Sequence, residues 1–561
     1  MKYVVSACDR ASRVSLGEPR SIFPKYASAS AGSMSHSGRP NQDLIWSRCP
    51  TSPRIVPSAS PAEAWRGRTR TTRRSRTAPA LPSTRAPSAR AGPEVLADIG
   101  LKPDDTGGEI TFEGADPVVP SALRLGAASG ITLVAKSAAI AALWKDRTGR
   151  GQDIHMDLRV GPHRLCPFYD QKWELLNGYV GGTPSLPNQA FVNSFYRTAD
   201  GRWMMPFNVY PNIKVAAQKL LGVGEVPEDV AAAISKWNAR ELEQAGAEAG
   251  CVMPMVRTPS EILTERQYTD VLANLPLVEI TRVGDSAPEP LPANPTAPLD
   301  GVRALGMGHV IAGAGVGRAM ALHGADVLNL WRPYELEHDV TYLTTSVGVR
   351  SATVSPYTKE GLARIHELQA GADVFYANRR PGFLDSIGLS EEESIARRPG
   401  LIYATVSLNG QTGPWKNYLG FDQTAGALTG LLHLEGDGDE PALPPITVVN
   451  DYLVSWFLTA GIAEALRRRT VDGGSYRVHV SLSRVALWIL SMGIFDKSYA
   501  QQVAGTGELH AYPGPEVFTA ETPLGHYQGV TDQVKMSDTP GAYRQILVPR
   551  GSQRAEWLPT A

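Results

Sequence analysis

The sequence has little cysteine, no long apolar run and almost no net charge. Its 4 cysteines among 561 residues are Cys8, Cys49, Cys166 and Cys251, which are too scattered for a disulfide framework or a CxxC metal site. No stretch approaches the ~20 uninterrupted apolar residues that a membrane span needs. P-loop, GxSxG and metal-spaced His/Asp/Glu patterns are also missing. These absences exclude several classes of membrane, secreted and metal-dependent protein, and they indicate a soluble globular chain.

The near-neutral charge is the sum of two unlike parts. The chain has 55 Lys+Arg against 56 Asp+Glu, but residues 1–92 hold 14 Arg and 2 Lys against 4 acidic residues. This Ser-, Pro- and Arg-rich segment lacks the apolar periodicity of a docked helix or strand, which predicts a disordered basic leader. The alternatives are a nucleic-acid-binding tail, an organelle-targeting peptide and a secretion signal, and each lacks a feature that it needs. Met34 offers a later start, and we assign no activity to this segment.

The rest of the chain has the composition of an ordinary α/β protein, and we divide it into four segments. They are a region with a small α+β domain (93–285), a Pro/Ala linker (286–299), a large domain (300–500) and a C-terminal return segment (501–561). In the large domain strands alternate with helices, as in GVRALGMGHVIAGAGVGRAMALHGADVLNLW, ADVFYAN and LIYATVSL. Such alternation predicts a doubly wound, Rossmann-like parallel sheet.

Shorter patterns predict individual elements. Helices are expected at 359–370 and 390–398 in the large domain. In the first region, the Ala-Asp-Gly of FYRTADGRWMMPF indicates a tight hairpin turn, followed by a helical stretch around 228–249.

The two regions also resemble each other, which indicates an internal duplication. IAALWKDRTGRGQDIHMDL (140–158) and IAEALRRRTVDGGSYRVHVSL (462–482) both predict the end of a helix, a Gly turn and a short strand. A looser match joins PLVEITRVGDSAPEP to PLGHYQGVTDQVKMSDTPG near the C-terminus.

The Gly-rich turn after the first strand of the large domain is a poor dinucleotide site. Gly313, Gly315 and Gly317 are spaced GxGxG rather than GxGxxG, and the next strand ends in Leu-Trp-Arg without the acidic residue that holds a ribose. Arg332, just past that strand, instead suits a ligand that carries phosphate. Parallel sheets bind ligands beyond the carboxyl ends of their strands.

Three stretches in order carry a family resemblance: the Gly-turn segment above, ADVFYANRRPGFLDSIGLSEEESIARRPGLIYATVSLNGQTGP, and NDYLVSWFLTAGIAEAL. Residues 300–482 resemble the class III (CaiB/BaiF) coenzyme A-transferase family. Residues 94–290 are similar to the later part of the same family, as a truncated, degenerate second copy. The resemblance implies transfer of CoA from an acyl-CoA to a carboxylic acid, without a metal, ATP, a nicotinamide or a flavin.

The family's catalytic aspartate matches Asp451, on which a mixed anhydride and a CoA thioester would form. Asp451 directly precedes YLVSWFLTAGIAEAL, whose apolar character predicts a buried helix. The helix dipole and free N–H groups would keep this carboxylate ionised. EGDGDEP (435–441) is a candidate donor of N–H groups to an oxyanion. The alternative is that Asp451 is only an N-cap.

The resemblance also implies the CoA contacts, which are Val310, Ile311, Ala312, Arg332, Asn378 and Arg379. Arg332 would pair with phosphates and Asn378 would hydrogen-bond the adenine or the pantetheine arm. The alternative for Arg332 and Arg379 is an ordinary solvated loop charge. Many relatives have an arginine shortly after the Pro-Gly pair, where this chain has Ser386.

Two other functions remain open. Acyl-CoA racemases of the same fold use a histidine where this chain has Phe421, and we expect the neighbouring Asp422 to orient a loop. A catalytically inactive acyl-CoA-binding protein is the other alternative. His155 and His479 are expected to be packed histidines.

The expected partners are small acyl-CoA and carboxylate molecules, with no nucleic acid and no membrane, and we expect a cytoplasmic location. When the two similar stretches are aligned, Ala128 of the first region takes the position of Asp451. Because alanine has no carboxylate, the first region is expected to be a non-catalytic partner. Relatives form interlocked dimers, which leaves open whether this chain works alone or as a homodimer.

Overall fold

The computed structural model describes residues 88–181 and 190–559, all within one compact unit, Pro82–Ala561. The predicted leader lies outside the described residues except for 88–92, which begin α1 (Ser88–Ile99). The predicted boundary after residue 92 therefore falls inside a helix. Of the four cysteines, Cys166 and Cys251 are described, and both are buried free thiols.

A seven-stranded sheet forms the centre of the fold, in the order β10-β9-β8-β11-β12-β13-β7. Its strands are β7 (Glu279–Gly284), β8 (Arg303–Met307), β9 (Asp326–Trp331), β10 (Arg350–Thr353), β11 (Val374–Ala377), β12 (Ile402–Ser407) and β13 (Ser475–Ser481). Six strands run parallel and only β7, at one edge, is antiparallel. The predicted Rossmann-like α/β fold is confirmed.

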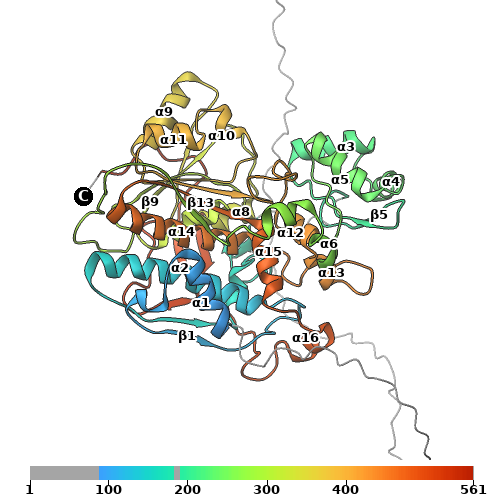
Figure 1. The fold of residues 1–561 in the computed structure, drawn as a ribbon, viewed down its shortest axis with the longest axis horizontal. Coiled ribbons are helices and arrows are strands. Elements are labelled where there is room, and N and C mark those ends of the chain that lie inside the picture. Colours follow the sequence, from blue (N-terminus) through green and yellow to red (C-terminus); the bar gives the residue numbers. More distant parts are fainter. Residues whose placement is uncertain (1–87, 182–189, 560–561) are drawn as a thin grey trace, which may run out of the picture. The chain divides into compact units, whose positions relative to one another are not determined.

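Helices cover both faces of this sheet because successive strand residues point to opposite sides. On β8, Ala304 belongs to the core on one face and Leu305 to the core on the other. On the face of Leu305 lie α9 (Lys359–Ala370), α10 (Phe383–Ser386) and α11 (Glu391–Arg397), and α14 (Asp451–Asp472) lies on the opposite face (Figure 1). That opposite face also carries α7 (Ala314–Leu322), which packs in the same core as Ala304. The helices expected at 359–370 and 390–398 are confirmed.

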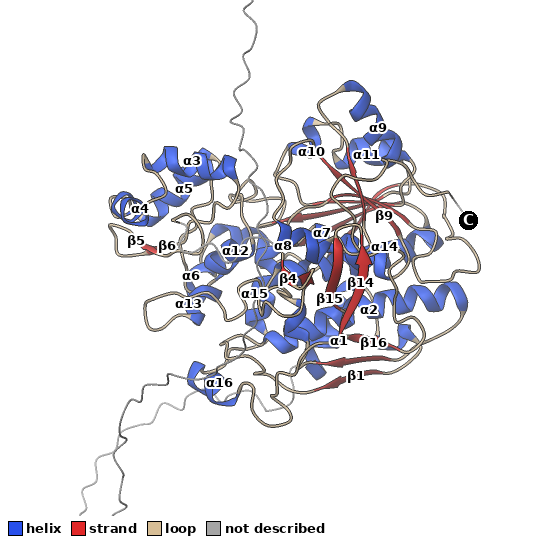
Figure 2. Ribbon diagram, turned by 180° about the vertical axis from the view of Figure 1, so that it is seen from behind, coloured by secondary structure: helices blue, strands red, loops and turns tan. Residues whose placement is uncertain are grey.

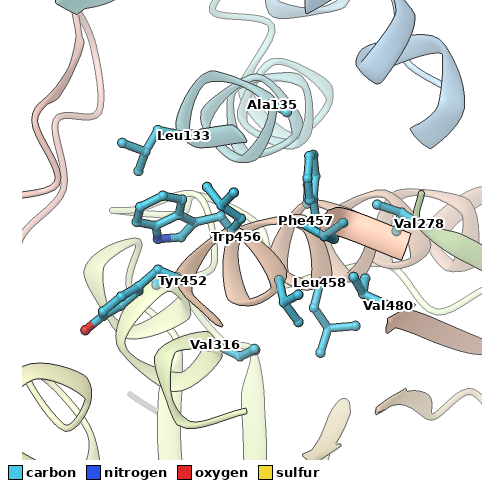
Figure 3. Packing of buried hydrophobic residues seen from close by; sticks show 14 of the residues in the cluster. Leu133, Ala135, Val278, Val316, Tyr452, Trp456, Phe457, Leu458 and Val480 are labelled. Carbon is cyan, nitrogen blue, oxygen red and sulfur yellow. The ribbon is translucent and has the colours of Figure 1, made fainter. Parts of the chain in front are cut away.

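The α14 helix is buried nearly all round between α7 and α2 (Leu125–Thr148). Figure 3 shows Trp456 beside Leu133 of α2, with Val316 of α7 on the opposite side of α14. Both long helices lack a polar face, as expected for helices enclosed by a core. By length and composition α2 could cross a membrane, but its apolar window is completely buried in this protein.

A second sheet packs against the other side of α2 and contains β1 (Ile110–Glu113), β2 (Ile154–Asp157) and β16 (Val534–Met536) (Figure 2). Its central strand, β2, pairs with β16 in antiparallel fashion, as β13 pairs with β7 in the large sheet. Thus β7, at the end of the first region, completes the sheet of the second region, and β16, near the C-terminus, completes the sheet of the first. We call this arrangement the strand exchange.

The predicted linker at 286–299 does not separate two cores, because the strand exchange and the α2–α14 contact join the regions on either side of it. The linker is itself held in place: Arg147 of α2 donates hydrogen bonds to the carbonyls of Pro292 and Pro298, each at 2.7 Å.

The small α+β domain is built on the predicted hairpin, β5 (Tyr196–Arg197) and β6 (Trp203–Met204). Its helices are α3 (Pro211–Leu221), α4 (Pro227–Ile234) and α5 (Ala239–Ala249). The helical stretch expected around 228–249 is observed as two helices, α4 and α5. Asp200 in the hairpin turn accepts the Ala239 N–H at 3.2 Å, which starts a second helix after a break.

The remaining elements are shorter. They are the helices η1 (Pro103–Thr106), η2 (Gly161–Arg164), α6 (Pro259–Ile262), η3 (Tyr268–Leu272), α8 (Asp339–Thr345), α12 (Asp422–Thr429), α13 (Leu431–Glu435), α15 (Leu482–Ser491) and α16 (Lys497–Val503). A four-stranded sheet joins β14 (Val517–Thr522) and β15 (Gly525–Val530) to β3 (Leu175–Leu176) and β4 (Tyr179–Val180).

The α2–α14 contact should dominate stability. Replacing Phe457, which is 0% exposed, by alanine leaves a cavity and should lower the free energy of unfolding by about 3–5 kcal/mol. Val471 lies on the same helix and is 74% exposed, so its replacement by alanine should cost less than about 0.5 kcal/mol. Urea unfolding followed by circular dichroism measures both, and equal effects would contradict the packing described here.

Candidate active site

The Asp451 side chain opens into a cleft with a volume of about 910 Å³. Asp451 is the first residue of α14 and is 6% exposed. The cleft also contains Val310, Ala312, Arg332, Asn378 and Arg379, so it brings together six of the seven predicted site residues. The seventh, Ile311, is buried behind the turn and is not part of the cleft lining.

A neighbouring carboxylate, Asp422 at the start of α12, fixes the segment that leads into α14. One oxygen of Asp422 accepts three successive backbone N–H groups, those of Val449 at 3.0 Å, Asn450, and Asp451 at 2.9 Å. The expectation that Asp422 orients a loop agrees with this geometry.

The expectation that helix N–H groups keep Asp451 ionised is wrong. Burial raises the pKa of Asp451 well above its ordinary value, and the negative charge of Asp422 raises it further. The N–H groups at this end of the helix are bound to Asp422 instead. Even with these hydrogen bonds, burial raises the pKa of Asp422 to about 6. Asp451 is therefore a desolvated carboxyl beside a second acid.

The Gly-rich turn lies directly against the first turn of α14. Ser455, one helical turn after Asp451, donates to the carbonyl oxygens of Ile311 at 3.1 Å and Ala312 at 2.9 Å. Val310 has a positive φ of 59°, and its N–H donates to the Glu337 carboxylate at 2.7 Å. These contacts set the distance between the turn and the carboxyl group.

Asn378 supports the same turn. Its side-chain oxygen accepts the His309 N–H at 3.0 Å, and its amide donates to the His309 carbonyl at 2.9 Å. A contact between Asn378 and a ligand stays a prediction, whereas its role in holding the turn is visible in the structure.

The guanidinium of Arg379 is occupied by contacts within the protein. Its side chain is 3% exposed and forms an ion pair with Glu335, and its Nε donates to the Met307 carbonyl at 2.6 Å. Arg332 is more open. It bonds Glu335 at 3.0 Å and the Tyr357 hydroxyl at 3.1 Å, and its guanidinium lies 5.1 Å from the Phe383 ring centre. Burial alone would raise the pKa of Glu335, but Arg379 and Arg332 outweigh it and hold the pKa at about 2.

The small domain supplies one wall of the cleft, as expected from the sequence, although the sequence did not point to Tyr210. Tyr210 precedes α3, and its hydroxyl donates to Glu337 at 3.2 Å. Its ring stacks on that of Phe421 with centres 6.0 Å apart. Asn212, Ile213 and Val252 of the same domain also line the cleft. Within one chain, therefore, the large and small domains face each other across Asp451.

Other predicted groups lie elsewhere or have packing roles. The 435–441 segment closes on itself through Asp437 and Glu440 and does not line the cleft, so it is not an oxyanion donor. His479 lines the cleft, but both of its ring nitrogens bond hydroxyls, those of Thr405 and Ser407, at 2.9 Å. Among residues 88–181 and 190–559, no group of three His, Cys, Asp or Glu side chains could hold a metal ion.

Replacing Arg379 by methionine should leave Glu335 buried without its main partner. At pH 7 we expect a loss of about 3–5 kcal/mol in the free energy of unfolding. Because the folded-state pKa of Glu335 is depressed to about 2, the ion pair stabilises fully above the unfolded pKa of ~4.3 and is lost as the pH falls towards 2. The deficit of the variant, measured by urea unfolding, should shrink over that range, and a constant deficit would contradict this account.

Comparison with known proteins places the site in a family. The model of CoA-transferase family III matches residues 299–541. The alpha subunit of succinyl-CoA–L-malate CoA-transferase from Chloroflexus aurantiacus is 32% identical over 228 residues, which cover 37% of this chain and 53% of that protein. The cinnamoyl-CoA:phenyllactate CoA-transferase of Clostridium sporogenes is 29% identical over 227 residues, covering 37% and 54%.

Each match spans about half the length of the relative. Among solved structures, a CaiB/BaiF family protein from Brucella suis is similar with a TM-score of 0.32 and 25% identity, over 41% of this chain and 65% of that one. The matched segment contains Asp451, the Gly-rich turn and all six parallel strands of the large sheet. Residues 299–541 of this chain, which hold the Asp451 site, thus match the model of CoA-transferase family III.

Proposed function

We propose that this protein is a CoA-transferase that moves CoA from an acyl-CoA to a carboxylic acid, with Asp451 as the nucleophile. The observation that carries the proposal is the position of the Asp451 carboxyl. It lies at the start of a buried helix, open to a large cleft, between the Gly-rich turn and the small domain. The family assignment of residues 299–541 supports the same activity.

The proposed reaction keeps the thioester energy through two covalent intermediates on Asp451. The carboxylate attacks the thioester carbonyl carbon, the C–S bond breaks, and CoA thiolate leaves a mixed anhydride. The thiolate then attacks the aspartyl carbonyl carbon, releases the first acid as carboxylate and forms an aspartyl-CoA thioester. The acceptor carboxylate attacks this thioester to give a second anhydride and free thiolate. Attack of the thiolate on the new acyl group regenerates Asp451 and yields the new acyl-CoA.

The surroundings of Asp451 suit this chemistry. A desolvated carboxylate is a stronger nucleophile than a hydrated one, and a closed site protects an anhydride from water. The wall provided by Tyr210 and the small domain would exclude water from the reacting atoms.

The cationic side of the cleft suits the phosphates of CoA. Arg380 and Lys416 are exposed in the cleft lining, and within the described part of the chain neither side chain has an acidic partner. With Arg332 they offer three cations to the ligand, whereas Arg379 holds Glu335. We therefore assign the phosphate contacts to Arg332, Arg380 and Lys416 and a supporting role to Arg379.

The aspartyl-CoA thioester gives the most direct test. After incubation of the protein with a mixture of acyl-CoA esters, peptide mass spectrometry should find CoA bound to Asp451. Asp451→Asn should abolish the adduct and lower the transfer rate by at least about a thousandfold, as expected for loss of a covalent nucleophile. Asp472→Asn, at the exposed far end of the same helix, is the matched control and should retain both. Binding of CoA without any adduct or turnover would favour an acyl-CoA sensor.

The pH dependence tests the carboxyl pair. Only ionised Asp451 attacks, and its pKa is raised by burial and by Asp422, so the rate should rise with pH along an acid limb above the usual carboxyl range. Asp422→Asn removes the neighbouring charge, lowers the pKa of Asp451 and should move this limb to lower pH by about one unit. The profile of kcat/KM against pH measures the shift. If the acid limb stays at the same pH and only kcat changes, Asp422 acts on Asp451 only through its hydrogen bonds to the backbone.

A further inference from the structure

The wall of the cleft beside Asp451 is aromatic. Phe421 immediately precedes Asp422, whose carboxylate accepts the Asp451 N–H. The Tyr210 ring stacks on the Phe421 ring with an angle of 12° between the two planes. Phe207 lies behind Phe421 with ring centres 5.2 Å apart and fixes its orientation. We call Tyr210 and Phe421 the aromatic wall. Such a wall offers flat apolar area at little cost in side-chain entropy.

The Asp451 carboxyl has no cationic partner in the part of the chain that the structure describes. Among the described residues, the charged group that acts on the Asp451 carboxyl is Asp422, and no cation offsets it. His309, which lies 6.2 Å from the Tyr210 ring, has its pKa lowered to about 3, mainly by burial and further by Arg379, and is therefore neutral. The Tyr210 hydroxyl is engaged with Glu337.

The cations of the cleft belong to other segments. Arg332 follows β9 and stacks over Phe383, Arg380 follows β11, and Lys416 lies in the loop after β12. In the proposed reaction a ligand whose phosphates use these cations must bring its thioester carbon to Asp451, and the aromatic wall lines the same cleft.

We infer that the acids handled by this site are monocarboxylic acids with an apolar, ring-bearing body, and not dicarboxylic acids. The inference rests on the proposed CoA transfer. A ring on the acyl group can pack against Tyr210 and Phe421. A second carboxylate in the same place would lose its water beside Asp422 and Asp451 without gaining a cation, which is strongly unfavourable.

An isotope-exchange assay tests the inference without knowledge of the physiological pair. The full chain is incubated with an acyl-CoA and its own ¹³C-labelled free acid, and label in the acyl-CoA is followed by mass spectrometry. We expect kcat/KM for 3-phenylpropanoyl-CoA with 3-phenylpropanoate to exceed that for glutaryl-CoA with glutarate by at least about tenfold. Equal or faster exchange of glutarate would overturn the inference and leave CoA transfer intact. Failure of every pair to exchange would instead overturn the proposed function.

Two matched variants locate the preference. Phe421→Leu shortens the aromatic wall and should lower the ratio of kcat/KM for 3-phenylpropanoyl-CoA to that for butanoyl-CoA by about fivefold. Phe383→Leu removes the ring under Arg332 and should change KM for both esters alike and leave the ratio unchanged. Circular dichroism spectra checked against wild type exclude misfolding, and the exposed Asp472→Asn variant serves as a further control for the ratio. A ratio that changes equally in both phenylalanine variants would place the acyl group elsewhere and overturn the inference.

Discussion

The geometry around Asp451 depends on one buried carboxylate that binds three backbone N–H groups. Asp422 collects the amides of residues 449–451 and so fixes both the entry angle of α14 and the position of the carboxyl group that opens into the cleft. A buried acid that accepts several amides is usually held ionised, but here burial dominates and leaves two acids side by side. Asp422 therefore both holds the start of α14 and raises the pKa of Asp451. A substitution of Asp422 that changes one of these effects also changes the other.

A second chain of contacts connects the small domain to the Gly-rich turn. Tyr210 donates to Glu337, and Glu337 in turn accepts the N–H of Val310, whose positive φ needs such a support. Asn378 holds the preceding residue, His309, by two hydrogen bonds. The position of the small domain and the conformation of the turn are thus coupled through one carboxylate. Movement of Tyr210 would loosen the turn that packs against the first turn of α14.

The sequence predicted the layout of the large sheet well and the chemistry around Asp451 less well. Alternating strands and helices between residues 300 and 482 depend on local periodicity, and the observed elements agree with it. By contrast, the proton affinity of Asp451 depends on Asp422, 29 positions away, and Tyr210 reaches the cleft from a separate domain. Arg379 matched a ligand-binding position by sequence, yet Glu335 occupies its guanidinium. Long-range burial and pairing of charges leave no trace in local spacing, and this is why these features were missed.

Because of the strand exchange, the two regions are held together by more than the covalent chain. β7 completes the sheet of the second region and β16 completes the sheet of the first, so each region holds the other by a backbone ladder in addition to the α2–α14 core. Covalent linkage at 286–299 mainly raises the effective concentration of two parts that already interlock. If the two regions were separate polypeptides, β7 and β16 would still pair with the same strands. A break in the linker would therefore leave the two regions together and the cleft, which has walls from both regions, assembled.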